Sequence, residues 1–267
     1  MTYATLDHPA DGVGVLTLAR EDRLNSLSFD LVVPLVELLN EAIDDRSIEC
    51  IILTGQGRAF CSGADVQDSE PPPDIDGLTV NQIATKAMDM LVGLIRTMRH
   101  APKPVIAAIN GPAIGGGLCL ALGTDIRIAA ESAYFRAAGI NNGLTALELG
   151  LSYTLPRAVG TSRAFEMALT GRDVGADEAV RMGLISRAVP DDRLMDEAVA
   201  MAQQILGWST NGVVHTKRLL WAGLESGSIE NAFELESTAQ LFMRMTTENF
   251  EEAMRARKEG RSPTFND

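Results

Sequence analysis

An uncharged stretch, residues 104–124 (PVIAAINGPAIGGGLCLALGT), is the sequence feature that most constrains how this chain can fold. Its length matches that of a membrane-spanning helix, and it contains the G-x-x-x-G spacing of packed membrane helices. Its middle, however, holds Asn110, Pro112 and the glycines 115–117, and these residue types turn or break a helix. The stretch therefore predicts a buried strand over 104–109, a turn and a buried helix, and we expect no membrane span.

Short apolar runs alternate with helical patterns along the chain, which favours an α/β fold. The expected strands cover residues 13–18, 50–54, 104–109 and 126–129, and the expected helices of the first hundred residues cover 28–43 and 80–99. Residues 66–79 contain three consecutive prolines and no Lys or Arg, so they predict a surface loop. From Thr161 onward the pattern is almost wholly helical, with no strand left to complete a sheet and a last helical stretch over 228–258.

Composition and charge limit the possible functions. The 267 residues carry a formal net charge of −13 and are 46% hydrophobic, which is enough for a sizeable core. Such an acidic chain is not typical of nucleic-acid-binding proteins, and local groups must hold any anionic ligand. The three histidines lie far apart in no ligand spacing, so we expect neither a metal site nor imidazole catalysis.

The cysteines and the N-terminus predict the compartment. The three cysteines form no C-x-x-C pair, which suits a reducing compartment and a fold without disulfides. The first residues contain no basic segment followed by an apolar one, so we expect no signal peptide. Together these features predict a cytoplasmic protein.

Two predicted strand-to-helix junctions hold small residues where the backbone turns, Ala59–Asp65 (AFCSGAD) and Asn110–Cys119 (NGPAIGGGLC). Backbone N–H groups left unpaired at such turns can bind an anion or a polarised carbonyl. Two of them converging on one oxygen form an oxyanion hole. Each segment alone is better explained by glycines that only permit close packing.

The two junctions, taken with further motifs, resemble the crotonase family, also called the enoyl-CoA hydratase/isomerase family, over essentially the whole chain. The motifs that carry the resemblance are DRLNSL (22–27), AFCSGAD (59–65), KPVIAAING (103–111), GGG (115–117), AYF (133–135), LPR (155–157), LTG (169–171) and GL (183–184). The resemblance implies a crotonase-like spiral of repeated ββα units over residues 1–195, which holds the acyl-CoA site. It also implies a C-terminal helical region over residues 196–267 that builds homotrimers, often paired into hexamers.

The implied ligand is a coenzyme A thioester, with no further cofactor, and its carbonyl rests on the backbone N–H groups of Ala64 and Gly116. In the family, backbone near Leu24 and a stretch after the first junction contact the nucleotide and the pantetheine. That stretch consists here of Ala64, Asp65, Val66 and Gln67. Family members often have a lysine where Gln67 stands, so a cationic phosphate contact is missing at this position.

A basic cluster near the C-terminus is the candidate for the missing phosphate contact. It contains Arg255, Arg257, Lys258 and Arg261. Lys258 is the residue that we expect to bind phosphate, within the chain or across a subunit boundary. A solvated helix face, with glutamates among the basic residues, explains the cluster equally well.

Family hydratases use two glutamates to hold and deprotonate water, and this chain has Cys119 and Gly139 at those positions. Neither can act as a carboxylate, which argues against water addition. For Cys119 we favour a buried apolar filler over a nucleophile. Counted back from Pro156, Glu148 falls where family isomerases carry their catalytic acid. An apolar environment would raise its pKa toward the working range, whereas the alternative is a surface glutamate in a helix turn.

We therefore expect an acyl-CoA enzyme of the isomerase type, which moves a double bond from position 3 to position 2. Glu148 would carry the proton while Ala64 and Gly116 stabilise the enolate. The first alternative is an enoyl-CoA hydratase whose water is handled by Glu148 or by Asn141 and Asn142. The second is a non-catalytic acyl-CoA-binding protein.

Overall fold

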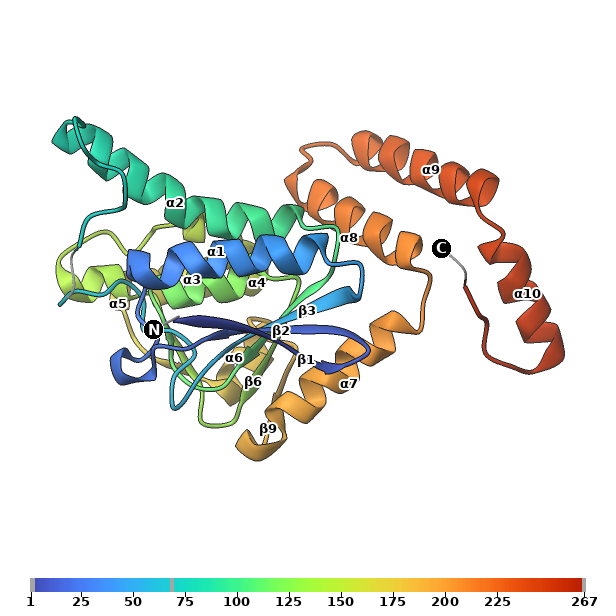
Figure 1. Cartoon of the computed structure of the whole chain (residues 1–267), viewed down its shortest axis with the longest axis horizontal. Coiled ribbons are helices and arrows are strands. Elements are labelled where there is room, and N and C mark those ends of the chain that lie inside the picture. Colours follow the sequence, from blue (N-terminus) through green and yellow to red (C-terminus); the bar gives the residue numbers. More distant parts are fainter. Residues whose placement is uncertain (1–2, 68–69, 266–267) are drawn as a thin grey trace.

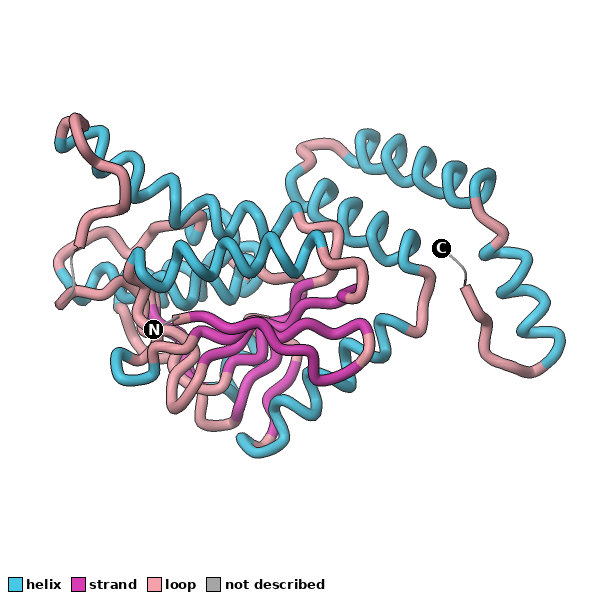
Figure 2. Tube along the Cα trace, in the orientation of Figure 1, coloured by secondary structure: helices cyan, strands magenta, loops and turns pink. Residues whose placement is uncertain are grey.

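The computed structural model describes residues 3–67 and 70–265, and its centre is a twisted sheet (Figures 1 and 2). In spatial order the strands are β1 (Ala4–Ala10), β2 (Gly12–Leu18), β3 (Ile48–Gly55), β4 (Val105–Ile109), β6 (Ile126–Ala130) and β9 (Arg187–Val189). β1 pairs with β2 antiparallel, whereas all the other neighbours are parallel. A smaller sheet contains β5 (Ala113–Ile114), β7 (Tyr134–Arg136) and β8 (Val174–Gly175).

Helices cover both faces of the larger sheet, because successive strand residues point to opposite sides. In β3, Ile51 and Leu53 join the main core, whereas Ile52 joins a second cluster. The main core includes residues of α1 (Phe29–Asp44), α2 (Val80–His100) and α3 (Gly116–Gly123). The second cluster is closed by α7 (Leu194–Leu206). Strands buried on both faces explain the continuous apolar runs in the sequence.

The middle of the chain alternates between the two sheets. β4 lies in the larger sheet and β5 in the smaller one, then α3 follows, and β6 and β7 repeat this order. The predicted buried strand and buried helix of 104–124 are confirmed as β4 and α3, and the segment between them, where a turn was expected, also contains the short strand β5. In the described part of the chain, no helix is both long and apolar enough to span a membrane.

The part of the chain after Thr161 is mostly helical, as expected, but the expectation that it holds no strand to complete a sheet is wrong. α4 (Leu151–Val159) precedes this part, which begins with α5 (Thr161–Thr170) and α6 (Ala176–Met182), but β8 lies between these two helices and β9 follows α6. β8 has two residues and β9 three, which is too short for any alternation to be recognised. β1 was also missed, since this edge strand contains a proline, a histidine and an aspartate. The short 3-10 helices are Glu21–Arg23, Ala138–Asn142 and Asp191–Arg193.

The last helices form an arm that extends away from the sheet (Figure 1). It contains α8 (Thr210–Glu225), α9 (Ile229–Thr246) and α10 (Asn249–Glu259). The single helical stretch expected over 228–258 is therefore wrong, because the helix ends before Thr247 and a new one begins at Asn249. The Thr247 hydroxyl donates to the carbonyl of Met243 (2.7 Å) at the end of α9. The predicted boundary between residues 195 and 196 falls inside α7, which packs on the sheet.

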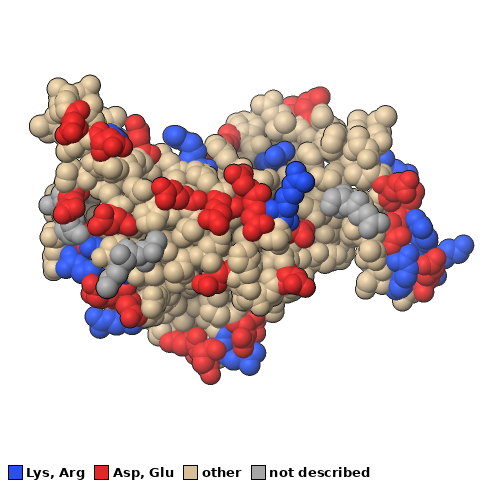
Figure 3. Space-filling model, viewed as in Figure 1, with Lys and Arg blue, Asp and Glu red and all other residues tan. Residues whose placement is uncertain are grey.

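Acidic side chains run across the face of the molecule in Figure 3, and basic ones lie beside acidic ones at the end that α10 occupies. On this face of the molecule, acidic side chains thus lie along the core as well as near α10.

Candidate active site

The two glycine-containing turns expected to bind the thioester lie side by side. Cys61 and Ala113 form a parallel β-bridge. The Cys61 N–H donates to the carbonyl of Pro112 (3.1 Å), and the Ile114 N–H donates to the carbonyl of Cys61 (3.0 Å). The turn after β3 and the turn after β4 are thus joined by backbone hydrogen bonds.

Glycines allow these backbones to approach closely. A Cβ atom on Gly117 would lie 2.1 Å from the carbonyl oxygen of Cys61, so only glycine fits there. Gly63 has φ +89°, and a Cβ on it would lie 2.7 Å from the Ile114 oxygen and 3.3 Å from the Gly116 nitrogen. The Gly116 nitrogen and the residue before Ala64 are therefore in contact.

The N–H groups of Ala64 and Gly116 are both available to a ligand. Leu27 bridges to Ala64 by donating to the carbonyl of Gly63 (2.7 Å) and accepting from the N–H of Asp65 (3.2 Å). In an extended segment the N–H of Ala64 itself then points the other way. Gly116 is the first residue of α3, where an N–H has no partner within the helix. Over residues 3–67 and 70–265, neither N–H has a backbone acceptor.

Glu148 lies against the turn formed by Gly115–Gly117 before α3, called the glycine turn below. A Cβ built on Gly115 would be 3.2 Å from Glu148 Oε1 and 4.0 Å from the Gly63 Cα. The carboxyl group is half-buried, and this loss of solvent raises its pKa above the ordinary value. The structure thus brings Glu148, Ala64 and Gly116 together. A carboxylate near such a turn can move a proton next to a carbonyl whose oxygen accepts hydrogen bonds from the turn's N–H groups.

The positions of the two hydratase glutamates have no carboxylate and little room. Cys119 is 2% exposed, and its thiol donates to the backbone carbonyl of Glu148 (3.5 Å). Burial raises the pKa of this thiol, which keeps it protonated. A Cβ on Gly139 would lie 1.9 Å from the carbonyl oxygen of Thr145, so no side chain fits there without a shift of the backbone.

The Asp65 side chain is occupied within the protein. Its carboxylate is 3% exposed and lies 2.7 Å from Arg20 Nη1 and 2.5 Å from Arg23 Nη2. Ser26 donates to the same carboxylate (3.0 Å). Asp65 therefore fixes the 20–26 turn next to the site, and any contact of this residue with coenzyme A has to use its backbone.

The other expected ligand contacts lie at the rim of this turn. Leu24 has φ +53°, and its carbonyl accepts from the Ser62 N–H (3.0 Å). Val66 is 79% exposed, and Gln67 Oε1 accepts from Arg23 Nη1 (2.7 Å). These residues leave exposed backbone and apolar surface beside Ala64.

Lys258 does not reach this site within one chain. It is exposed on α10, at the opposite end of the molecule from α3 and α5 (Figure 1). Arg255 and Arg261 of the same cluster are paired with Glu252, at 3.6 and 2.6 Å. The basic cluster can serve the candidate site only in a neighbouring copy.

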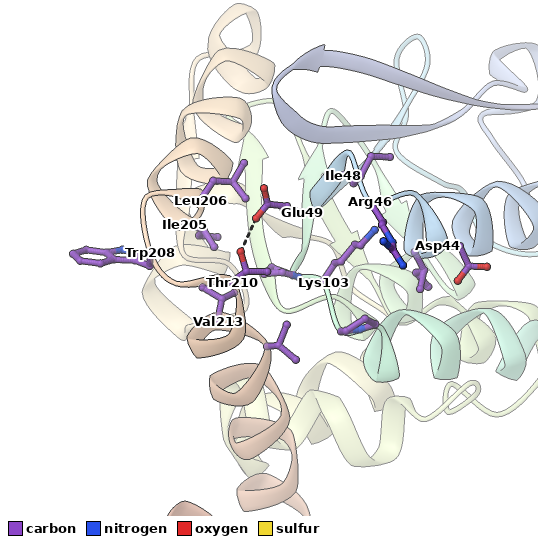
Figure 4. A pocket seen from close by; sticks show the side chains of 14 residues that line it. Asp44, Arg46, Ile48, Glu49, Lys103, Ile205, Leu206, Trp208, Thr210 and Val213 are labelled. Atoms are coloured by element: carbon purple, nitrogen blue, oxygen red, sulfur yellow. Dashed lines mark hydrogen bonds between the residues drawn. The ribbon is translucent and has the colours of Figure 1, made fainter. Parts of the chain in front are cut away.

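A separate hollow of about 260 Å³ lies at the ends where β3 and β4 begin, between the α7–α8 turn and the loop before β4 (Figure 4). Three of its polar side chains, those of Glu49, Lys103 and Thr210, bond to one another or to the backbone. Glu49 accepts from the Thr210 hydroxyl (2.8 Å), and Lys103 Nζ donates to the carbonyls of Ala42 (2.8 Å) and Asp45 (2.6 Å). This hollow is apart from Glu148. Among residues 3–67 and 70–265, no group of three His, Cys, Asp or Glu side chains could hold a metal ion.

Comparison with known proteins supplies the family. The sequence model of the enoyl-CoA hydratase/isomerase family matches residues 9–267. This chain belongs to that family. The resemblance to the crotonase family is thereby confirmed, and the acyl-CoA thioester fits the family.

The relatives carry both activity names. A probable enoyl-CoA hydratase of Mycobacterium tuberculosis is 53% identical over 267 residues, which are 100% of this chain and 94% of the relative. A probable enoyl-CoA hydratase/isomerase from Mycobacterium abscessus has a crystal structure that is 48% identical, with a TM-score of 0.94, covering 99% of this chain and 98% of that one. A monofunctional enoyl CoA isomerase from M. smegmatis is 50% identical, with a TM-score of 0.75, covering 87% of this chain and 99% of that one.

Two features of this family member were missed from the sequence. Asn25 is fully buried, and its side-chain amide donates to the carbonyl of Ala59 (2.8 Å), which holds the loop before Ala64. Leu149, next to Glu148, has φ +47°. The motif DRLNSL contained the first signal. The pair Leu149–Gly150 contained the second, since glycine after a non-helical residue often marks a left-handed turn.

Proposed function

We propose that this protein is an enoyl-CoA isomerase that moves a double bond of an acyl-CoA thioester from position 3 to position 2. The observation that carries the proposal is the half-buried carboxylate of Glu148, with Oε1 only 3.2 Å from a Cβ position on Gly115, beside the free N–H of Gly116. A proton carrier and an oxyanion site thus meet at one turn.

The reaction follows from these groups. The thioester oxygen accepts hydrogen bonds from the N–H groups of Ala64 and Gly116, which stabilise the enolate. The Glu148 carboxylate removes a proton from C2, and the electrons shift through the C2–C3–C4 system. C4 then takes the proton back from Glu148, which leaves the double bond between C2 and C3. No water is consumed, and one carboxyl group suffices for both transfers.

Packing near Glu148 weighs against the hydratase alternative. The carbonyl of Thr145 fills the space that a side chain at Gly139 would need, and the thiol of Cys119 donates to the backbone of Glu148. Asn141, considered as a water ligand, donates its side-chain amide to the carbonyl of Gly171 (3.3 Å). Of the groups considered for handling water, Glu148 and the exposed Asn142 are left.

Names among the relatives favour both candidate reactions. The M. smegmatis protein is called a monofunctional enoyl CoA isomerase, whereas the M. tuberculosis relative is called a probable enoyl-CoA hydratase. Hydration is therefore the second candidate function, and acyl-CoA binding without turnover is the third.

The proposal includes a homotrimer, alone or paired into a hexamer. α9 has no buried residue and α10 buries only Ala256, so within one chain many apolar side chains of these helices stay exposed. A neighbouring copy would cover them and would bring Lys258 toward the phosphates of coenzyme A.

Purified protein offered 3-enoyl-CoA and 2-enoyl-CoA in separate assays distinguishes the three candidates. We expect conversion of the 3-enoyl thioester and no hydration of the 2-enoyl thioester. Glu148→Gln should lower kcat for isomerisation by about 10²–10⁴-fold, because an amide cannot carry the proton. Glu37→Gln, which changes an exposed carboxylate on α1, is the matched control and should leave kcat unchanged.

Three results would contradict the proposal. Hydration of 2-enoyl-CoA without isomerisation would assign a hydratase. Tight binding of both thioesters without turnover would assign a binding protein. Isomerisation that survives Glu148→Gln would remove Glu148 from its role.

A further inference from the structure

We propose that Leu149 is a positioning residue whose left-handed backbone and side chain hold the Glu148 carboxylate against the glycine turn. The inference rests on the proposed function, because it concerns how the proton carrier of that reaction is placed. It starts from the backbone of the residue that directly follows Glu148.

Leu149 has φ +47°, a conformation that an L side chain adopts only at a cost in energy. The next residue, Gly150, has φ +85°, and α4 begins at Leu151. Glycine would adopt the same turn at position 149 without this cost. Residues in such strained conformations cluster at functional sites, where the surrounding structure holds them.

The Leu149 side chain contacts the part of the site that would bind the thioester oxygen. It is half-buried and packs on the main core. Its Cδ1 lies 3.8 Å from a Cβ position on Gly116, whose N–H is one of the two proposed donors. Leu149 therefore contacts the glycine turn with its side chain and restricts the backbone next to Glu148.

The rest of the Glu148 backbone is also fixed. Its carbonyl accepts from the Leu151 N–H (2.8 Å) and from the Cys119 thiol (3.5 Å). With these contacts on one side, the dihedral angles of Leu149 set the direction in which the chain leaves Glu148. Glycine at this position would make both signs of φ accessible, and the carboxylate would then sample orientations toward solvent.

The test compares Leu149→Gly with Leu149→Ala in the full chain. Alanine removes the side-chain contact and keeps the backbone strain, whereas glycine removes both. We expect Leu149→Gly to be more resistant to urea than Leu149→Ala and yet less active, with kcat lowered by about ten- to a hundredfold and KM within about twofold. A merely structural role would rank the two variants in the same order for stability and activity.

The pH profile supplies a second readout. If the carboxylate in Leu149→Gly moves toward solvent, its pKa falls toward the ordinary value, and the acidic limb of kcat shifts to lower pH. Asp74→Gly is the matched control, since Asp74 also has positive φ (+54°) but lies in an exposed loop. This variant should leave kcat and the pH profile unchanged.

Leu149→Gly with the kcat and acidic limb of the natural protein would overturn the inference. If Glu148→Gln is inactive in the same assay, only the role of Leu149 fails. If Glu148→Gln keeps full activity, the proposed function fails and the role of Leu149 fails with it.

Discussion

At the scale of single residues, the burial of Glu148 sets the expected pH dependence. Burial raises its pKa, so the carboxylate, which is the proton-accepting form, is present only above a pH higher than an ordinary glutamate requires. We expect kcat for isomerisation to fall as pH decreases through this raised pKa, with the midpoint above the ordinary value of about 4.3. A pH series of kcat, with circular dichroism at each pH to verify folding, measures this. An acidic limb at or below about pH 4 would contradict it.

The residues of the candidate site differ in how well the sequence predicted them. Counting from Pro156 proposes Glu148 as the proton carrier, which stays a prediction, and the expected rise of its pKa agrees with its partial burial. Cys119 was expected to be a buried filler, and it is buried, but its bond to the Glu148 carbonyl was not foreseen. That bond depends on how the turn before α4 packs on α3, which no local pattern reveals. Local patterns also did not reveal the lack of room for a side chain at Gly139 or the conformation of Leu149.

At the scale of elements, the attachment of α8 shows why patterns of apolar residues fall short. The buried residue of α8 is Lys217, not an apolar side chain. Its Nζ lies 2.8 Å from Asp125 Oδ2 and donates to the carbonyls of Met98 (3.0 Å) and Lys103 (2.9 Å). Trp221 Nε1 donates to the same aspartate (2.7 Å). Helices α1 and α2 were predictable because each buries a periodic apolar face, and strands β3, β4 and β6 because they are short apolar runs. What holds α8 in place was not predictable, because it is a buried charge.

Removing the Lys217 ammonium should therefore loosen the arm. Lys217→Met leaves Asp125 buried without its cation, and we expect the free energy of unfolding to fall by about 3–5 kcal/mol. Lys86→Met is the control, because Lys86 Nζ lies 4.0 Å from an exposed Asp74 carboxylate. This substitution should change the free energy of unfolding by less than about 1 kcal/mol. Urea titrations of both variants measure the difference. Equal midpoints would show that the buried pair does not anchor α8.

At the scale of the whole molecule, the arm of α8, α9 and α10 exposes many large apolar side chains to solvent in a single chain. Leu241 is 61% exposed and Met245 is 81% exposed, one turn apart on α9. We expect Leu241→Glu combined with Met245→Glu to convert the proposed trimer into monomers, because charged groups would be buried in its interface. Val80→Glu, at an equally exposed apolar position on α2, should leave the mass unchanged. Sedimentation analysis measures the masses, and a natural protein that sediments as a monomer would refute the trimer.

The position of Lys258 connects assembly to ligand binding. Since α10 and the glycine turn lie at opposite ends of one chain (Figure 1), Lys258 can contact the coenzyme A phosphates only in a neighbouring copy. Lys258→Ala should therefore raise KM for the coenzyme A thioester several-fold without changing kcat, because a phosphate contact away from the reacting atoms binds substrate and transition state alike. The KM for a pantetheine thioester without the nucleotide should not change. Arg193→Ala is the control for lost surface charge.

The same contact gives a test of the assembly itself. In the Leu241→Glu, Met245→Glu protein, Lys258 has no neighbouring site, so KM for the coenzyme A thioester should already be raised, and adding Lys258→Ala should raise it no further. Independent, multiplicative effects of the arm and lysine substitutions would instead mean that Lys258 acts without a neighbouring copy. A solvated helix face, the other explanation of the basic cluster, would leave KM unchanged when Lys258 is replaced in the assembled protein.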